Sequence, residues 1–264
     1  MTPLTAPVQL SPHLYILYSE YPHHDSGNAY LITGRYPTLI DCGSQHAFPQ
    51  LVTNLAQTGL AIRDLTQIIA THGDYDHIQS YHDLRREHPF IRLHIHRQDW
   101  PSVQECDPYR NGSYIYNRAL EPIAAESCLP LEQGEIIAAG DTTLQVHHTP
   151  GHTEGSVCLL GEIDGHRVLF AGDTVGGGMR SLDKAVLEIW AQAAVSWKQS
   201  LQRLAALDFE WVLNGHEPAR SLPISRARFD RAVASFGWML SPWFTLDEED
   251  PVSPLTAPAT AVFD

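Results

Sequence analysis

Residues 71–77 read THGDYDH and place four candidate metal ligands within six residues, directly after the apolar run QIIA at 67–70. In an extended chain, residues two apart point to the same side, so His72 and Asp74 can converge on one ion. Asp76 and His77 follow where the chain turns, and they can face a second ion. A loop does not need imidazoles and carboxylates at this spacing in order to be soluble. The stretch therefore favours a metal site over a merely solvated loop.

Three further candidate ligands each lie in a glycine-containing turn after an apolar run. They are His152 in TPGHTEGS, Asp173 in FAGDT and His216 in LNGHEP. Glycine lets the backbone turn sharply, and loops held at the ends of strands are where binding residues tend to collect. Runs with β-like alternation and runs with helical spacing also succeed one another along the chain. That succession predicts an α/β fold.

The composition argues against several classes of function. The chain has 264 residues, with 17 Lys+Arg against 31 Asp+Glu and a net charge of −14. This charge repels a phosphate backbone, so we expect no nucleic-acid partner. No apolar run approaches the ~20 residues of a spanning helix, and the first residues do not resemble a signal peptide. We therefore predict a cytoplasmic protein that acts on a small molecule without a membrane partner, and a homodimer is left open.

The pattern along the chain predicts one domain over residues 1–240. A tyrosine-rich segment at about 101–133 is interpreted as an insertion over the core. Two roles for it stay open, because a tyrosine can line a pocket under a lid or pack at the surface with its hydroxyl in water. Residues 241–264 are rich in proline and acidic side chains, which predicts a C-terminal tail outside the domain.

The ligand pattern His72-x-Asp74-x-Asp76-His77 resembles that of the metallo-β-lactamase-fold hydrolase superfamily, in its glyoxalase-II-like branch. His152, Asp173 and His216 follow in the order of that family. LIDCG at 39–43 matches a further family motif, and the spacing of Trp197, Ser200, Leu201 and Leu204 resembles the helix before the last histidine. The resemblance covers about residues 13–220. It implies a four-layer αβ/βα sandwich with a metal site at one edge between two sheets.

The same resemblance implies two divalent metal ions and makes zinc the expected metal. One would be held by His72, Asp74 and His152, the other by Asp76, His77 and His216, and Asp173 would bridge them. A dication lowers the pKa of bound water and polarises a substrate oxygen. The implied reaction is attack of metal-bound hydroxide on an ester, thioester or lactone carbonyl of a small, anionic or neutral substrate. Asp76 is also expected to orient this hydroxide.

The chain departs from the family pattern at Asp74, where the usual HxHxDH motif has its second histidine. The extra carboxylate favours harder ions such as manganese or iron over a zinc selected by imidazole alone. Three arrangements stay open, since Asp74 can bind a metal directly, bind it through water, or leave a site for a single metal. We favour direct ligation.

Three residues are predicted to contact the substrate. Arg220 stands four residues after His216 and can pair with an anionic group. His24 lies in the loop YPHHDSGN, which borders the active site in the family, and Tyr114 belongs to the insertion. Two alternative functions use the same scaffold. One is an iron-dependent oxidoreductase resembling persulfide dioxygenases, favoured by the carboxylate at 74, and the other is a nuclease, which the acidic charge disfavours.

Overall fold

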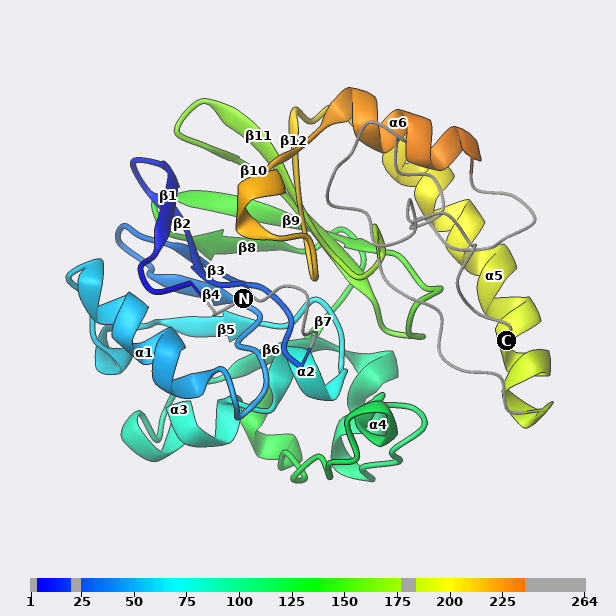
Figure 1. The fold of residues 1–264 in the computed structure, drawn as a ribbon, viewed down its shortest axis with the longest axis horizontal. Helices are drawn as coiled ribbons and strands as arrows, with labels where there is room; N and C mark the ends of the chain where they lie inside the picture. The colour runs from blue at the N-terminus through cyan, green and yellow to red at the C-terminus, as the bar shows by residue number, and fades with distance from the viewer. Residues whose placement is uncertain (1–3, 20–24, 177–183, 236–264) are drawn as a thin grey trace, which may run out of the picture.

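Two β-sheets form the middle of the molecule and helices cover their outer faces (Figure 1). A computed structural model describes residues 4–19, 25–176 and 184–235. The predicted α/β sandwich is confirmed. His24 and the predicted tail at 241–264 lie outside the described residues.

The first sheet has seven strands in chain order. They are β1 (Val8–Ser11), β2 (Leu14–Tyr18), β3 (Ala29–Ile32), β4 (Thr38–Ile40), β5 (Gln67–Ile69), β6 (Leu93–His96) and β7 (Cys128–Leu131). The pairs from β1 to β4 are antiparallel, and those from β4 to β7 are parallel. Connections between the parallel strands run through helices. These are α1 (Phe48–Gln57), α2 (Tyr75–Ile78), α3 (Tyr81–Glu87) and α4 (Trp100–Gln104), with the short 3-10 helices η1 (Ile62–Asp64), η2 (Arg97–Asp99), η3 (Ser113–Tyr116) and η4 (Ala125–Ser127).

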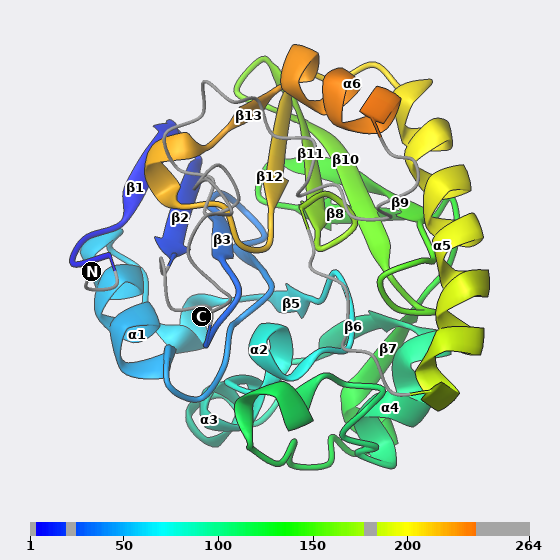
Figure 2. The ribbon, with the colours of Figure 1, turned by 45° about the vertical axis from the view of Figure 1, so that its right-hand side comes forward.

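The second sheet has six strands in the order β13-β12-β11-β10-β9-β8. They are β8 (Ile136–Ala139), β9 (Thr142–His148), β10 (Val157–Ile163), β11 (His166–Gly172), β12 (Trp211–Asn214) and β13 (Ile224–Ser225). β11 and β12 are parallel, and the long helix α5 (Lys184–Ala205) connects them. Figure 2 shows α5 and α6 (Arg226–Ser235) on the side of the molecule away from α1 and α3. The short helix η5 (Ala219–Ser221) precedes β13.

The alternation of side chains along the strands divides the core into two clusters. Leu14 and Ile16 of β2 face the second sheet and join the cluster that contains Leu144 of β9. Leu17 points to the other side and packs in the cluster that contains Leu51 of α1. Each sheet therefore buries both faces, as expected for strands enclosed between a helical layer and another sheet.

Helix α5 covers the second sheet through a buried stripe. Trp197, Leu201 and Leu204 are each at most 3% exposed, as helical spacing in the sequence predicted. The helix thus packs against the second sheet, whose strands precede three of the candidate ligands.

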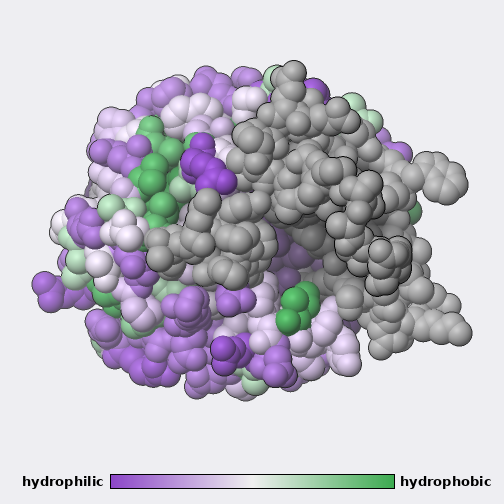
Figure 3. Space-filling model, viewed as in Figure 1, coloured by the Kyte–Doolittle hydropathy of each residue, from purple (hydrophilic) through white to green (hydrophobic). Residues whose placement is uncertain are grey.

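The tyrosine-rich segment is shorter than predicted at its C-terminal end. Cys128–Leu131, expected within the insertion at 101–133, pair with β6 as the edge strand β7. Pro130 argues against a strand in this run, because proline cannot donate a ladder hydrogen bond. An edge strand tolerates proline, because one side of it needs no such bond. None of the helices in the described part of the chain is long and apolar enough to span a membrane. On the face shown in Figure 3, the described surface is mostly hydrophilic, with small hydrophobic patches set apart from one another.

Candidate metal centre

The candidate ligands meet at one edge of the sandwich because each follows the C-terminal end of a strand. His72 and Asp74 follow β5, and Asp76 and His77 begin the first turn of α2. His152, Asp173 and His216 follow the strands of the second sheet; these are β9, β11 and β12, respectively. Rigid strands on both sides thus present the loops that carry chemistry at a shared edge.

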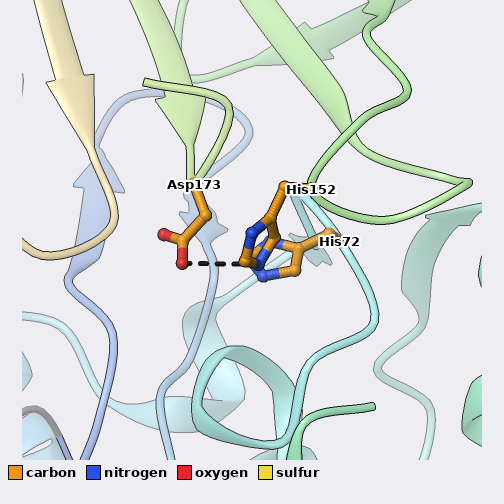
Figure 4. A group of neighbouring side chains, drawn as sticks. All are labelled: His72, His152 and Asp173. Atoms are coloured by element: carbon orange, nitrogen blue, oxygen red, sulfur yellow. Dashed lines mark ion pairs between the residues drawn. The ribbon is translucent and has the colours of Figure 1, made fainter. Parts of the chain in front are cut away.

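The first group of donor atoms comprises His72, His152 and Asp173, whose ligand atoms all lie within 4.8 Å of one another. Figure 4 shows the two imidazoles turned toward the carboxylate, with His152 Nε2 at 3.5 Å from Asp173 Oδ2. Asp74 faces the same group. Its Oδ2 lies 3.0 Å from His152 Nε2 and 3.5 Å from His72 Nε2. This placement agrees with a direct role for Asp74 in holding a cation.

The second group comprises Asp76, His77 and His216. His216 Nε2 lies 3.3 Å from Asp76 Oδ2 and 3.4 Å from His77 Nε2. Asp173 lies between the two groups, because its Oδ2 is 3.1 Å from His216 Nε2 as well as 3.5 Å from His152 Nε2. The structure therefore brings together all the residues predicted as ligands, with Asp173 in the central position.

The electrostatics of the second group are those of carboxylates and imidazoles that share positive charge. Burial lowers the pKa of His216, but Asp173 and Asp76 outweigh burial and raise it to about 10. Burial raises the pKa of Asp173, yet His216 and His77 hold it well below its usual range. Metal ions compete with protons for such donors. A divalent cation would supply the positive charge that protonated imidazoles otherwise provide.

The donor set fits a bound cation. Among the described residues, His72 Nε2 and Asp173 Oδ1 are buried and make no hydrogen bond. Buried polar atoms are normally satisfied, and both atoms point into the space shared by the two groups, with His77 Nε2 3.4 Å from Asp173 Oδ1. Imidazole and carboxylate together suit zinc, manganese or iron. The residues present are thus suited to divalent metal ions.

Asp41 supports the centre from the end of β4. Its Oδ2 lies 2.9 Å from His77 Nδ1, while its two oxygens accept hydrogen bonds of 2.7 Å from the backbone N–H and the hydroxyl of Thr71. A carboxylate on one imidazole nitrogen fixes the ring so that the other nitrogen faces the metal position. Asp41 has a φ of +54°, a left-handed conformation that aspartate tolerates better than most residues.

The residues predicted to contact substrate are only partly placed. Arg220 lies in η5 with an exposed side chain, four residues after His216. Tyr114 lies half-buried in η3, and its ring centroid is 5.0 Å from that of Tyr109. His24 lies outside the described residues. The substrate contacts of all three stay predictions.

The insertion reaches the centre through two residues that the sequence did not single out. The backbone of Gly112 passes Asp74 so closely that a Cβ at 112 would lie 3.4 Å from Asp74 Oδ2. The Tyr116 hydroxyl lies within hydrogen-bonding reach of Asp76; burial first and then this carboxylate raise the pKa of the phenol. The backbone N–H of Tyr75 donates a 2.8 Å hydrogen bond to Asn111 O, which ties the insertion to α2. The segment therefore lies against both aspartates of the THGDYDH stretch.

Arginines near the C-terminal end of the described chain have structural partners. Arg228 Nη2 lies 3.0 Å from Glu217 Oε1, and Glu217, which directly follows His216, is only 3% exposed. Arg226 donates hydrogen bonds of 2.6 Å to the carbonyls of Ala205 and Leu207 at the end of α5. The pair of Arg228 with the buried Glu217 could not be found from the sequence, because nothing local links two residues on opposite sides of β13.

Comparison with known proteins places the sequence and the fold in one group. The family model described as "Metallo-beta-lactamase superfamily" matches residues 24–216. The acyl-coenzyme A thioesterase MBLAC2 of Bos taurus is 27% identical over 180 residues, which cover 60% of this chain and 61% of that protein. The hydroxyacylglutathione hydrolase of Hahella chejuensis is 27% identical over 188 residues, 69% of this chain and 57% of that protein.

A solved structure supports the fold alone. BJP-1, a subclass B3 metallo-beta-lactamase of Bradyrhizobium japonicum, superposes with a TM-score of 0.67 at 22% identity, covering 80% of this chain and 79% of that chain. The chain spans less than two thirds of the length of both curated relatives described above. The whole activities of those relatives are therefore not carried over by the match itself.

Proposed function

Because the chain belongs to the metallo-β-lactamase superfamily, we propose that it is a metal-dependent hydrolase of acyl thioesters. The observation that carries the proposal is the position of Asp173, whose carboxylate lies 3.1 Å from His216 Nε2 and 3.5 Å from His152 Nε2. One carboxylate can thus serve both groups of ligands. Two relatives act, by their names, on acyl groups carried by coenzyme A or glutathione, which supports a thioester among the carbonyl substrates that the fold admits.

The chain supplies the binding and orienting groups for this reaction. When bound, divalent cations would supply a water of lowered pKa and an electrophile for the acyl oxygen. His72, Asp74 and His152 would hold one cation, and Asp76, His77 and His216 would hold the other. Asp76 would also accept a hydrogen bond from the attacking water and orient it. No serine or cysteine nucleophile is needed, because water is the nucleophile.

The insertion offers the surface on which an acyl group would rest. Tyr109 and Ile115 are each 55% exposed, although both carry large apolar groups. They flank Gly112, whose backbone passes Asp74. An acyl chain laid on this segment would place its thioester carbonyl beside the ligands. Arg220 is the proposed contact for an anionic carrier, since guanidinium pairs bidentately with phosphate or carboxylate.

We expect two bound metal ions, which are either zinc or a harder ion such as manganese or iron. Zinc follows from the family, while the carboxylate of Asp74, 3.0 Å from His152 Nε2, adds an oxygen ligand that suits manganese or iron. Metal analysis of protein purified without added metal tests both the number and the identity of the ions.

The test of function is a substrate panel on the same protein. Acyl-coenzyme A, acyl-glutathione, simple esters, lactones and a β-lactam are compared before and after chelation and after metal is restored. We expect thioester hydrolysis that chelation abolishes and that His152→Ala reduces by at least about 100-fold. The matched control is His166→Ala, because this half-buried histidine pairs with Glu210 and begins β11, at the end of the strand away from Asp173. Thioesterase activity that survives complete metal removal would contradict the proposal. Oxygen uptake with a persulfide, or cleavage of single-stranded nucleic acid, would point to the alternative functions instead.

A further inference from the structure

Asp99 is a buried carboxylate outside the set of candidate ligands, and it is only 1% exposed. It ends the short helix η2, after β6, and thus comes from a part of the chain that supplies none of the ligands described above. Three donors converge on it. Asp99 Oδ2 accepts hydrogen bonds from Gly73 N at 2.8 Å and Thr153 Oγ1 at 2.9 Å, and Oδ1 accepts one from Gly155 N at 2.7 Å.

The three donors belong to the two loops that carry the first group of ligands. Gly73 lies between His72 and Asp74, and Thr153 follows His152 directly. One carboxylate therefore joins a loop of the first sheet to a loop of the second sheet. Asp99 links the backbones that position these ligands, without lying among the ligands.

Glycines in the two ligand loops leave room for Asp99 to approach them. A Cβ at Gly73 would lie 3.1 Å from Asp99 Cβ, and a Cβ at Gly155 would lie 2.5 Å from Asp99 Cγ. Real Cβ contacts under 3.0 Å are essentially never seen, so any other residue at 155 would displace the carboxylate. The glycines of the two loops thus provide space for one side chain that comes from a third segment.

The chemistry requires a carboxylate at this position. All three partners are donors, and a charged acceptor strengthens such hydrogen bonds. An asparagine has the same shape but offers one oxygen and one NH₂ group. In either orientation its NH₂ group would therefore face a backbone N–H, that of Gly73 or that of Gly155, which can only donate. A buried donor left without an acceptor destabilises the arrangement that buries it.

We propose that Asp99 is a positioning residue for the first metal position, which holds the loop of His72 and Asp74 in register with the loop of His152. The inference goes beyond the proposed function, because it concerns cation binding and is independent of the substrate. Groups that orient metal ligands typically change metal affinity about 10–100-fold when they are mutated.

The experiment titrates the metal-free protein with zinc ions alone and compares variants. His152→Ala first identifies the binding step that depends on the first group. We expect Asp99→Asn to weaken this same step by about tenfold and to leave any other step within about twofold. Thr153→Val removes a single donor to Asp99 and should weaken the step less. It keeps the test available if Asp99→Asn does not fold.

The matched control is Asp164→Asn. Asp164 also accepts three hydrogen bonds or close contacts, from Ser11 Oγ at 2.6 Å, His13 N at 2.7 Å and His13 Nδ1 at 2.6 Å. It lies in the turn between β10 and β11, at the end of β11 opposite Asp173. Asp164→Asn should lower stability while leaving zinc affinity as in the wild type. Unchanged zinc affinity in both Asp99→Asn and Thr153→Val would overturn the proposal, as would an equal loss at every binding step. Because no substrate is used, this outcome is separate from the fate of the thioesterase proposal.

Discussion

Gly215→Ala tests whether the position of the central carboxylate controls activity. Gly215 precedes His216, and a Cβ at 215 would lie 1.9 Å from Asp173 Oδ1 and 2.8 Å from His77 Cε1. Since Cβ contacts under 3.0 Å are essentially never seen, the carboxylate must retreat by about 1.1 Å, the difference between 3.0 and 1.9 Å. A displacement of about 1 Å at a reacting centre can cost roughly 100-fold in rate. We expect a loss of kcat of this size, with weaker metal binding because both groups share Asp173.

The assay measures kcat and KM on the best thioester of the panel, together with metal content and the unfolding transition of the same samples. Gly165→Ala is the control. Gly165 has a φ of +84°, but a Cβ added there would have nothing within 4 Å, so alanine costs about 1 kcal/mol of backbone strain without touching the centre. A Gly215→Ala protein that keeps its metal and turns over within about threefold of the wild type would refute the reasoning.

Two further changes have outcomes that follow from the contacts. Asp74→Asn keeps the size of the side chain but removes its charge, so we expect the zinc-binding step that depends on His152 to weaken by about tenfold and manganese binding to weaken more; equal affinities would exclude direct ligation. Burial and then His148 lower the pKa of His96 to about 4 in the folded protein. The imidazole of the unfolded chain is therefore protonated at a higher pH than that of the folded protein, and stability falls as the pH is lowered from 6.5 to 4. Urea unfolding should show about 2–3 kcal/mol more loss over this interval for the wild type than for His96→Gln, and parallel losses would contradict the assignment.

The candidate ligands could be predicted from sequence because their positions are local. Each follows an apolar run that becomes a strand, and a strand end fixes where the next side chain lies. The roles of the glycines that precede these ligands were predicted only in part. Gly172 before Asp173 has a φ of +46°, as a sharp turn requires. Gly215 has no positive φ, and its role is to leave room for Asp173. That second role depends on a residue from another strand, which no local pattern reveals.

The supporting residues could not be predicted for a related physical reason. Asp99 and Tyr116 reach the centre from segments outside the THGDYDH stretch and outside the three glycine-containing turns that carry the other candidate ligands. Their importance depends on where β6 and the insertion pack, and this is decided by the tertiary fold. The one local signal was the group of tyrosines in the insertion, which left a lid and surface packing equally open. Contacts of Gly112 with Asp74 and of Tyr116 with Asp76 show that this segment packs on the centre.

Asp74, where the chain departs from the family motif, packs against the insertion. The backbone of Gly112, with a φ of +69°, passes so near that a Cβ there would lie 3.4 Å from Asp74 Oδ2. The carboxylate also lies 3.0 Å from His152 Nε2, so it fills the room between the insertion and the first group. An imidazole is larger than a carboxylate and would have to push the insertion outward or rotate away from His152. Asp74→His is therefore not a simple return to the family motif, because the insertion on this chain is packed against the smaller side chain. The carboxylate of Asp74 and the segment proposed to carry the acyl group therefore pack as one structural unit.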